Sequence, residues 1–158
     1  MKAALYEQFQ GPIQIRQKAG AVVALNARRT EDVSLAIHEI TQGGAQLSVD
    51  ALGSQETCRN SILCLCKRGR HIQIGLMAGP EANPKIPMHV VIARELEILG
   101  SHGMQAHQYP GMRKVITSGK LRPERMIGKR LTLEEGAQEL KAMDAFQGVG
   151  VTVIRLEG

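Results

Sequence analysis

Three short segments between residues 47 and 103 decide the fold: LSVDALG (47–53), RHIQIG (70–75) and LEILGS (96–101). Each is an apolar or alternating run that ends at or beside a glycine, and a segment with helical spacing lies between the first two. A strand, a helix and a second strand in this order are typical of a parallel sheet with helices packed on it. The sequence therefore predicts an α/β fold with strands at 47–51, 70–75 and 95–99.

The segments around these strands predict the helices. Thr30 is a candidate N-cap for a helix that ends at the glycine pair 43–44, and Ser54 is a candidate N-cap for a second helix. The basic run 67–71 is interpreted as the end of that second helix, where it complements the helix dipole. After an irregular Pro/Gly-rich crossing, a helical turn is predicted at 88–94 and a longer helix at 106–118.

The two ends of the chain add further β structure. Residues 1–7 and 13–17 flank a Gln-Gly-Pro turn and predict a β-hairpin, and residues 21–26 form an apolar run typical of a buried strand. Near the C-terminus, Thr132 and Glu135 form a capping box that opens a helix to about residue 144. A short extended piece at 126–127 precedes that helix, and a β-branched strand at 149–156 follows it.

Composition places the chain in an ordinary globular class. It has 158 residues, 43% hydrophobic and 22% charged, with a net charge of +5. Because the basic residues are interleaved with acids along the chain, we expect no nucleic-acid partner. No apolar run reaches the roughly 18 residues of a membrane span, and no signal peptide is recognised, so we expect no membrane partner and a cytoplasmic location.

The three cysteines do not predict a metal site or a disulfide. Cys58, Cys64 and Cys66 are an odd number within one predicted helix, without C-x-x-C spacing. We interpret them as reduced thiols that pack in the core.

Several motifs, taken in order, resemble one known family. The opening MKAALYE (1–7) with its hairpin, VDALG (49–53), GRHIQIGL (69–76) and GSHG (100–103) resemble the medium-chain zinc-dependent alcohol dehydrogenases. The resemblance implies a partial Rossmann-like parallel sheet flanked by helices, with an N-terminal hairpin and a C-terminal helix-strand return. We expect a single compact domain over 1–158, made of hairpin 1–17, Rossmann-like half 21–119 and catalytic-domain remnant 121–158.

The resemblance also indicates an internal deletion. The part of the family that would carry the zinc ligands, the proton relay and the glycine-rich phosphate turn shrinks to about residues 18–20, and no G-x-G-x-x-G occurs in the chain. We therefore expect no zinc, no metal-binding residue and no catalytic residue, and no cofactor that the protein requires. Without zinc, we identify no residue in the sequence that would polarise a substrate carbonyl.

The surviving half still implies a site for NAD(P). By resemblance, backbone groups after the second and third strands contact the nicotinamide, and the turn after the first strand lies near the ribose. Strand carboxyl ends are where α/β sheets place ligands. The candidate cofactor-binding residues are Leu52, Gly53, Ile74, Gly75, Leu76, Ser101, His102 and Gly103.

The deletion predicts self-association. In a Rossmann sheet the missing strands would lie beside 47–51, which leaves that strand with an open edge. We expect the hairpin or residues 21–26 to fill this edge, from the same chain or from a second one. The family also dimerises through its last Rossmann strand, here 95–99, so we expect a homo-oligomer, most simply a dimer.

Three functions stay open from the sequence. The first in rank is a folded, oligomeric protein of this family that is not a catalyst. The alternative is an oxidoreductase of the family that binds NAD(P) weakly. The third is an unrelated activity at Ser101, His102 and His107, which lack an acid partner and an oxyanion site.

Overall fold

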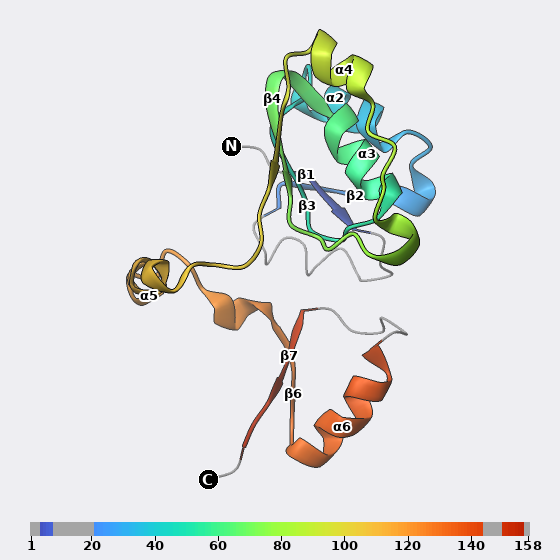
Figure 1. The fold of residues 1–158 in the computed structure, drawn as a ribbon. Helices are drawn as coiled ribbons and strands as arrows, with labels where there is room; N and C mark the ends of the chain where they lie inside the picture. The colour runs from blue at the N-terminus through green and yellow to red at the C-terminus, as the bar shows by residue number, and fades with distance from the viewer. Residues whose placement is uncertain (1–3, 8–20, 144–149, 157–158) are drawn as a thin grey trace. The chain divides into compact units, whose positions relative to one another are not determined.

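The computed structural model describes residues 4–7, 21–143 and 150–156, and the chain divides into two compact units (Figure 1). One unit is residues 25–103, and the other combines residues 1–24 with 104–158. This division differs from the boundaries expected at 17, 21, 119 and 121. A single compact domain over 1–158 stays a prediction.

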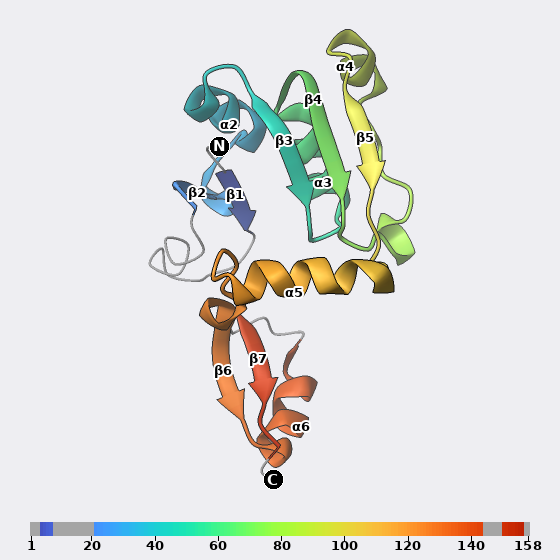
Figure 2. The ribbon, with the colours of Figure 1, turned by 90° about the vertical axis from the view of Figure 1, so that its left-hand side faces the viewer.

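The unit 25–103 is built on a parallel sheet of three strands in the order β3-β4-β5. The strands are β3 (Ala45–Asp50), β4 (Leu65–Gln73) and β5 (Glu97–Gly100). Val49 lies opposite Ile72, and Ile72 lies opposite Leu99, so these residues share one row across the sheet. The predicted α/β class and its three strands are confirmed, and Figure 2 shows the strands side by side.

Two helices cover one face of this sheet, α2 (Val33–Thr41) and α3 (Gln55–Leu63) (Figures 1 and 2). Ser54 caps α3 as predicted, in a capping box with Thr57. The prediction for the start of α2 is wrong, because Asp32 and not Thr30 is its N-cap. The Thr30 hydroxyl instead donates to the Asn26 carbonyl, at 2.9 Å, beside the 3-10 turn η1 (Ala27–Arg29).

The end of α3 also differs from the prediction. The helix stops at Leu63, and β4 begins at Leu65, so the basic run 67–71 belongs to a strand. Arg68 and Arg70 pair with Glu95 and Glu97 at 2.6 and 2.7 Å rather than with the helix end. Backbone pairing with β3, which includes Leu65 opposite Ala45, and with β5 forms the strand, because tertiary pairing overrides a local helix pattern.

The strand β2 (Val23–Asn26) forms where an apolar run was predicted, but it does not join this sheet. It pairs with β1 (Ala4–Glu7) in a separate two-stranded sheet. The expectation that residues 21–26 fill the edge of β3 within the chain is therefore wrong. The second strand of the predicted hairpin, 13–17, lies outside the described residues. In the described part of the chain, the outer edge of β3 carries no strand.

The crossing from β4 to β5 runs through the turn η2 (Gly79–Glu81) and the short helix α4 (Met88–Ala93), as predicted. Arg94, at the end of α4, holds the crossing to the unit. Its Nη1 atom donates to the Leu63 carbonyl at 2.8 Å and to the Leu65 carbonyl at 2.7 Å. One guanidinium thereby ties the end of α3 and the start of β4 to α4.

The core of this unit lies between α2, α3 and the sheet. Among the described residues, Ile62, Leu65 and His71 are the largest side chains with no exposed surface. Val33, Ile37, Cys58 and Cys64 complete the buried apolar set. The core is small, and a histidine is at its centre.

The C-terminal elements follow in the other unit. They are η3 (Ala106–Gln108), α5 (Tyr109–Thr117), η4 (Pro123–Met126), β6 (Ile127–Leu131), α6 (Leu133–Lys141) and β7 (Val151–Ile154). β6 and β7 pair in parallel, and β6 is longer than the predicted piece at 126–127. The Thr132–Glu135 capping box of α6 is confirmed. A Cβ at Gly136 would meet the end of the Ile154 side chain, so α6 approaches β7 closely at this glycine.

Candidate functional site

The eight predicted cofactor-binding residues lie on the loops that leave β3, β4 and β5 at their carboxyl ends. Gly53 and Gly75 approach so closely that a Cβ on either would collide with the backbone of the other loop. Ser101 is tied to the neighbouring strand, since its N–H donates to the Gln73 carbonyl at 2.9 Å. The structure thus brings the three loops to one edge of the sheet.

Asp50, the last residue of β3, organises the first two loops, and only 3% of its surface is exposed. Its Oδ1 accepts from the N–H groups of Leu52 and Gly53 at 2.9 and 3.0 Å. Its carbonyl accepts from the N–H groups of Ile74 and Gly75 at 2.9 and 2.8 Å. One residue therefore sets the backbone conformation after both strands.

Two more donors complete the environment of the Asp50 carboxylate. The Thr57 hydroxyl donates to Oδ1 at 3.1 Å, and the Gln73 amide donates to Oδ2 at 2.9 Å. Such a set of hydrogen bonds offsets the unfavourable burial of a charge. Sequence reasoning missed Asp50, although an aspartate three residues before a glycine is a known signal for a turn closed by its own side chain.

His71 extends this network into the core. Its Nδ1 lies 3.3 Å from the Ser48 hydroxyl and 3.0 Å from the Ser61 hydroxyl, and its Nε2 lies 3.1 Å from Oε1 of Gln73. Because the Gln73 amide nitrogen already donates to Asp50, its Oε1 must accept from His71. His71 therefore carries its proton on Nε2, and Nδ1 accepts from a serine hydroxyl, with Ser61 the nearer donor at 3.0 Å.

Burial lowers the pKa of the His71 imidazole below its ordinary value of 6.5, and this effect outweighs the opposing influence of Gln73 and Asp50. The ring is neutral at pH 7. Since no part of its surface is exposed, it cannot reach a substrate in this conformation. Its role in the site is to hold Gln73, which in turn holds Asp50.

Much of the backbone of the predicted site is already occupied by these bonds. The N–H groups of Leu52, Gly53, Ile74, Gly75 and Ser101 all donate within the protein. Among the described residues, the N–H groups of Leu76, His102 and Gly103 have no protein acceptor. The loops therefore fit NAD(P) in part: they keep three backbone donors for a ligand, while the phosphate turn is missing from the sequence.

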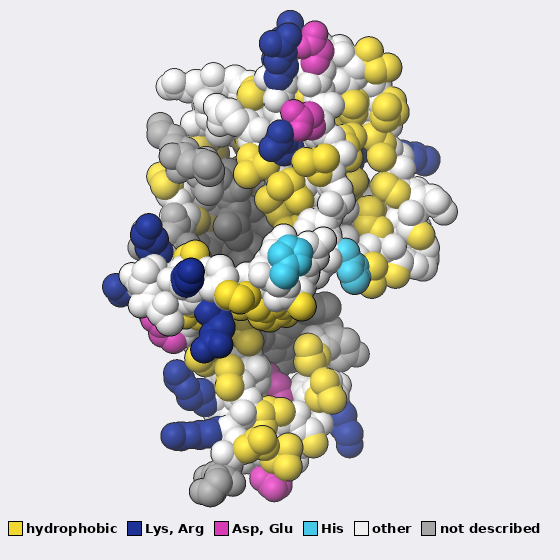
Figure 3. Space-filling model, turned by 60° about the vertical axis from the view of Figure 1, so that its left-hand side comes forward, with side chains coloured by type: hydrophobic (Ala, Val, Ile, Leu, Met, Phe, Trp, Pro, Cys, Tyr) yellow, Lys and Arg dark blue, Asp and Glu magenta, His cyan; other side chains and the backbone are white. Residues whose placement is uncertain are grey.

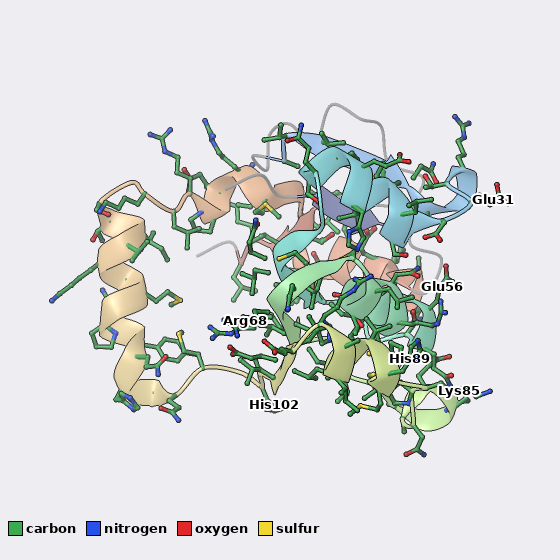
Figure 4. All side chains as sticks on the ribbon, turned by 90° about the horizontal axis from the view of Figure 1, so that it is seen from above. Glu31, Glu56, Arg68, Lys85, His89 and His102 are labelled. Carbon is green, nitrogen blue, oxygen red and sulfur yellow. The ribbon has the colours of Figure 1, made fainter. Side chains whose placement is uncertain are left out.

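The third predicted group, Ser101 with His102 and His107, is divided between the two units. Ser101 and His102 lie in the unit 25–103, whereas His107 belongs to the other unit, so the described structure does not test the set as a whole. His102 is exposed on the loop after β5 (Figure 4). An activity at these three residues stays a prediction.

The described cysteines and histidines do not fit a zinc ion. Zinc binds thiolates, yet burial raises the pKa of Cys64 to about 11, and burial together with the charge of Asp50 raises that of Cys58. Both nitrogens of His71 are bonded, and His38 Nε2 lies 3.2 Å from the Arg94 guanidinium. No group of three or more His, Cys, Asp or Glu side chains in residues 4–7, 21–143 and 150–156 could hold a metal.

Residues 10–118 match the sequence model of one family, described as zinc-binding dehydrogenase. This match covers more than half of the chain. The chain belongs to the zinc-binding dehydrogenase family. The predicted family is thus confirmed, and the loops after β3, β4 and β5 are those of this dehydrogenase fold.

Curated relatives of this dehydrogenase family member are polyol dehydrogenases. A D-arabitol-phosphate dehydrogenase of Enterococcus avium is 29% identical over 77% of this chain, which spans 34% of that relative. A sorbitol dehydrogenase of Halalkalibacterium halodurans is 22% identical over 91% of this chain, which spans 43% of that relative. The chain therefore spans less than half the length of the relatives it matches.

Solved structures of alcohol dehydrogenases share the fold. A 2R,3R-butanediol dehydrogenase from Bacillus subtilis has a TM-score of 0.82 at 18% identity, over 96% of this chain and 43% of that one. An alcohol dehydrogenase from Aeropyrum pernix has a TM-score of 0.79 at 22% identity, over 96% of this chain and 42% of that one. The predicted Rossmann-like architecture is confirmed at this level.

Proposed function

We propose that this zinc-binding dehydrogenase family member is a non-catalytic protein that works as a homo-oligomer. The observation that carries the proposal is the uncovered face of the sheet in the unit 25–103. On that face, Leu47, Val49 and Leu99 are 43%, 49% and 43% exposed. Parallel sheets are stable when both faces are covered, and among the described helices α2 and α3 cover only one face.

The charges on the same face are already neutralised. Arg68 pairs with Glu95 and Arg70 with Glu97, beside the apolar row of Val49, Ile72 and Leu99. Figure 3 looks onto this side, where apolar groups gather next to acid–base pairs. A second copy of the chain can bury the apolar row without leaving an unpaired charge, and it can pair with the bare edge of β3.

The test is the mass of the protein in solution. We expect a dimer or larger oligomer by light scattering at micromolar concentration, and a monomer after Val49→Lys, because a lysine in the apolar row opposes burial. Ile92→Lys is the matched control, since Ile92 is 73% exposed and belongs to α4 rather than to a strand of the sheet. A monomeric mass for the unchanged protein would contradict the proposal.

A second candidate function is weak NAD(P) binding without a required cofactor or zinc. The Asp50-organised loops at the strand ends support it, because they leave backbone donors at Leu76, His102 and Gly103. Titration with NADH and NADPH, followed by calorimetry, tests it. Saturable binding at sub-millimolar to millimolar cofactor is the expected result, and no heat at millimolar cofactor would remove this candidate.

A further inference from the structure

The positive charge of this protein is concentrated in one segment, residues 113–130. Seven of the 20 Lys and Arg residues lie there, against one of the 15 acidic residues. The other 140 residues carry 13 basic and 14 acidic side chains and are nearly neutral. The net charge of +5 is therefore a property of this segment, which we call the basic segment. The expected interleaving of basic with acidic residues holds only outside it.

The basic segment runs from the second half of α5 through η4 into β6, and all seven of its cations are exposed. They are Arg113, Lys114, Lys120, Arg122, Arg125, Lys129 and Arg130. Lys129 forms an ion pair with Glu139 at 2.8 Å. Among the described residues, the other six have no carboxylate within ion-pair distance. Figure 3 shows Lys and Arg groups gathered over the C-terminal elements, with apolar groups between them.

Apolar side chains alternate with these cations and are also exposed. Val115 is 43% exposed, and Leu121 and Met126 are both 48% exposed. In α5 the apolar residues Tyr109, Met112, Val115 and Ile116 fall on one side of the helix by their spacing, with Arg113 next to them. The segment thus combines an amphipathic helix with a run of unpaired cations.

In place of the expectation of no membrane partner, we propose that the basic segment binds the surface of an anionic lipid bilayer. Cations alone would suit any polyanion, but exposed aliphatic side chains gain free energy only where they can leave water, as they do at the boundary between headgroups and acyl chains. A nucleic acid backbone offers the negative charge without that apolar layer. The sequence also has no Trp and only two Tyr and two Phe residues, so it is poor in stacking groups for single-stranded nucleic acid.

The test is co-sedimentation of the full chain with vesicles of phosphatidylcholine alone or with one quarter phosphatidylglycerol. We expect binding to the mixed vesicles in 50 mM NaCl, at least tenfold weaker binding to neutral vesicles, and release in 500 mM NaCl because salt screens the attraction. The triple variant Arg122→Gln, Arg125→Gln, Arg130→Gln should bind the mixed vesicles at least tenfold more weakly. The double variant Val115→Ser, Leu121→Ser should also bind the mixed vesicles more weakly. A purely electrostatic contact would be unaffected by this change.

The matched control removes the same charge elsewhere. Arg59→Gln, Lys67→Gln and Lys85→Gln change exposed cations of the unit 25–103 and should leave vesicle binding within twofold of the unchanged protein. Equal loss in both triple variants would assign the effect to net charge and overturn the proposal. Equal binding to neutral vesicles, or tighter binding to a 20-base-pair DNA duplex than to mixed vesicles, would overturn it as well. Circular dichroism of each variant separates loss of binding from loss of fold.

Discussion

Asp50 is the residue on which most of the local order at the strand ends depends. It satisfies two N–H groups and a hydroxyl with one carboxylate oxygen, and two more N–H groups with its carbonyl. Removing a buried acceptor leaves its donors without a partner, which is less favourable than losing the bond alone.

Replacement of Asp50 should therefore destabilise the protein strongly. We expect Asp50→Ala to lower the free energy of unfolding by about 2–4 kcal/mol, and Asp50→Asn by less, because the amide oxygen still accepts. Urea unfolding followed by circular dichroism measures both. Glu31→Gln, an exposed change near α2, is the control and should have little effect. An Asp50→Ala variant as stable as the control would contradict the network described above.

His71 predicts how stability varies with pH. Its pKa is lowered in the folded protein, so the unfolded chain binds more protons between the folded-state pKa and about 6.5. The contribution of His71 to the free energy of unfolding should therefore be fully present above about pH 6.5 and should decrease as the pH drops below that value. Urea midpoints measured from pH 7.5 to 5.0 test this, and His71→Gln should make the curve flatter. The same change at exposed His89 should not alter the slope.

At the scale of elements, the N-caps at Ser54 and Thr132 are the features that sequence reasoning predicts best, and a capping box is predicted only at Thr132. Ser54 and Thr132 each accept from the residue three positions later, as an isolated motif suggests. Such local signals work because the partners are close in sequence and need no tertiary contact.

Loss of a cap should affect the helix that it begins. We expect Ser54→Ala to reduce the free energy of unfolding by about 1 kcal/mol, since the Thr57 N–H loses its acceptor. Ser54→Asn, which can still accept, should recover most of this loss. Thermal unfolding of the three proteins provides the measurement, and identical midpoints would show that the cap adds no stability.

Signals that depend on distant residues are harder to predict. The run 67–71 resembles a basic helix end, yet it lies in β4, which pairs with two strands from distant parts of the sequence. Thr30 resembles an N-cap, but its hydroxyl donates to the Asn26 carbonyl. Likewise, the glycines that end the strand segments indicate where the site loops begin. The role of Asp50 and Gln73 could not be predicted, because their hydrogen bond forms only when β3 and β4 are neighbours.

At the scale of the whole molecule, burial is uneven between the two units. The buried apolar side chains of the described residues, from Val33 to Leu65, belong to the unit 25–103. In the C-terminal elements, large apolar side chains such as Leu140 and Leu156 are 69% and 74% exposed. Stability should follow this difference, because apolar burial is the main favourable contribution to folding.

Hydrogen exchange should reveal the difference directly. We expect amides of β4 and α3 to exchange most slowly, and those of β6, β7 and α6 to exchange at least tenfold faster. Ile62→Ala should speed exchange in β4, because Ile62 has no exposed surface and its truncation leaves a cavity of the kind that costs about 2–5 kcal/mol. Uniform protection across both units would contradict this division.

The parallel pairing of the sheet, together with the bare edge of β3, also affects how the chain folds. Each strand of the sheet pairs in parallel, so no pairing can form until the helix between the two strands has folded back. Pairing between distant segments is slow, and during that delay the apolar strands meet other chains as readily as their own neighbours. Folding yield should therefore fall as the chain concentration rises during refolding. Dilution should restore it.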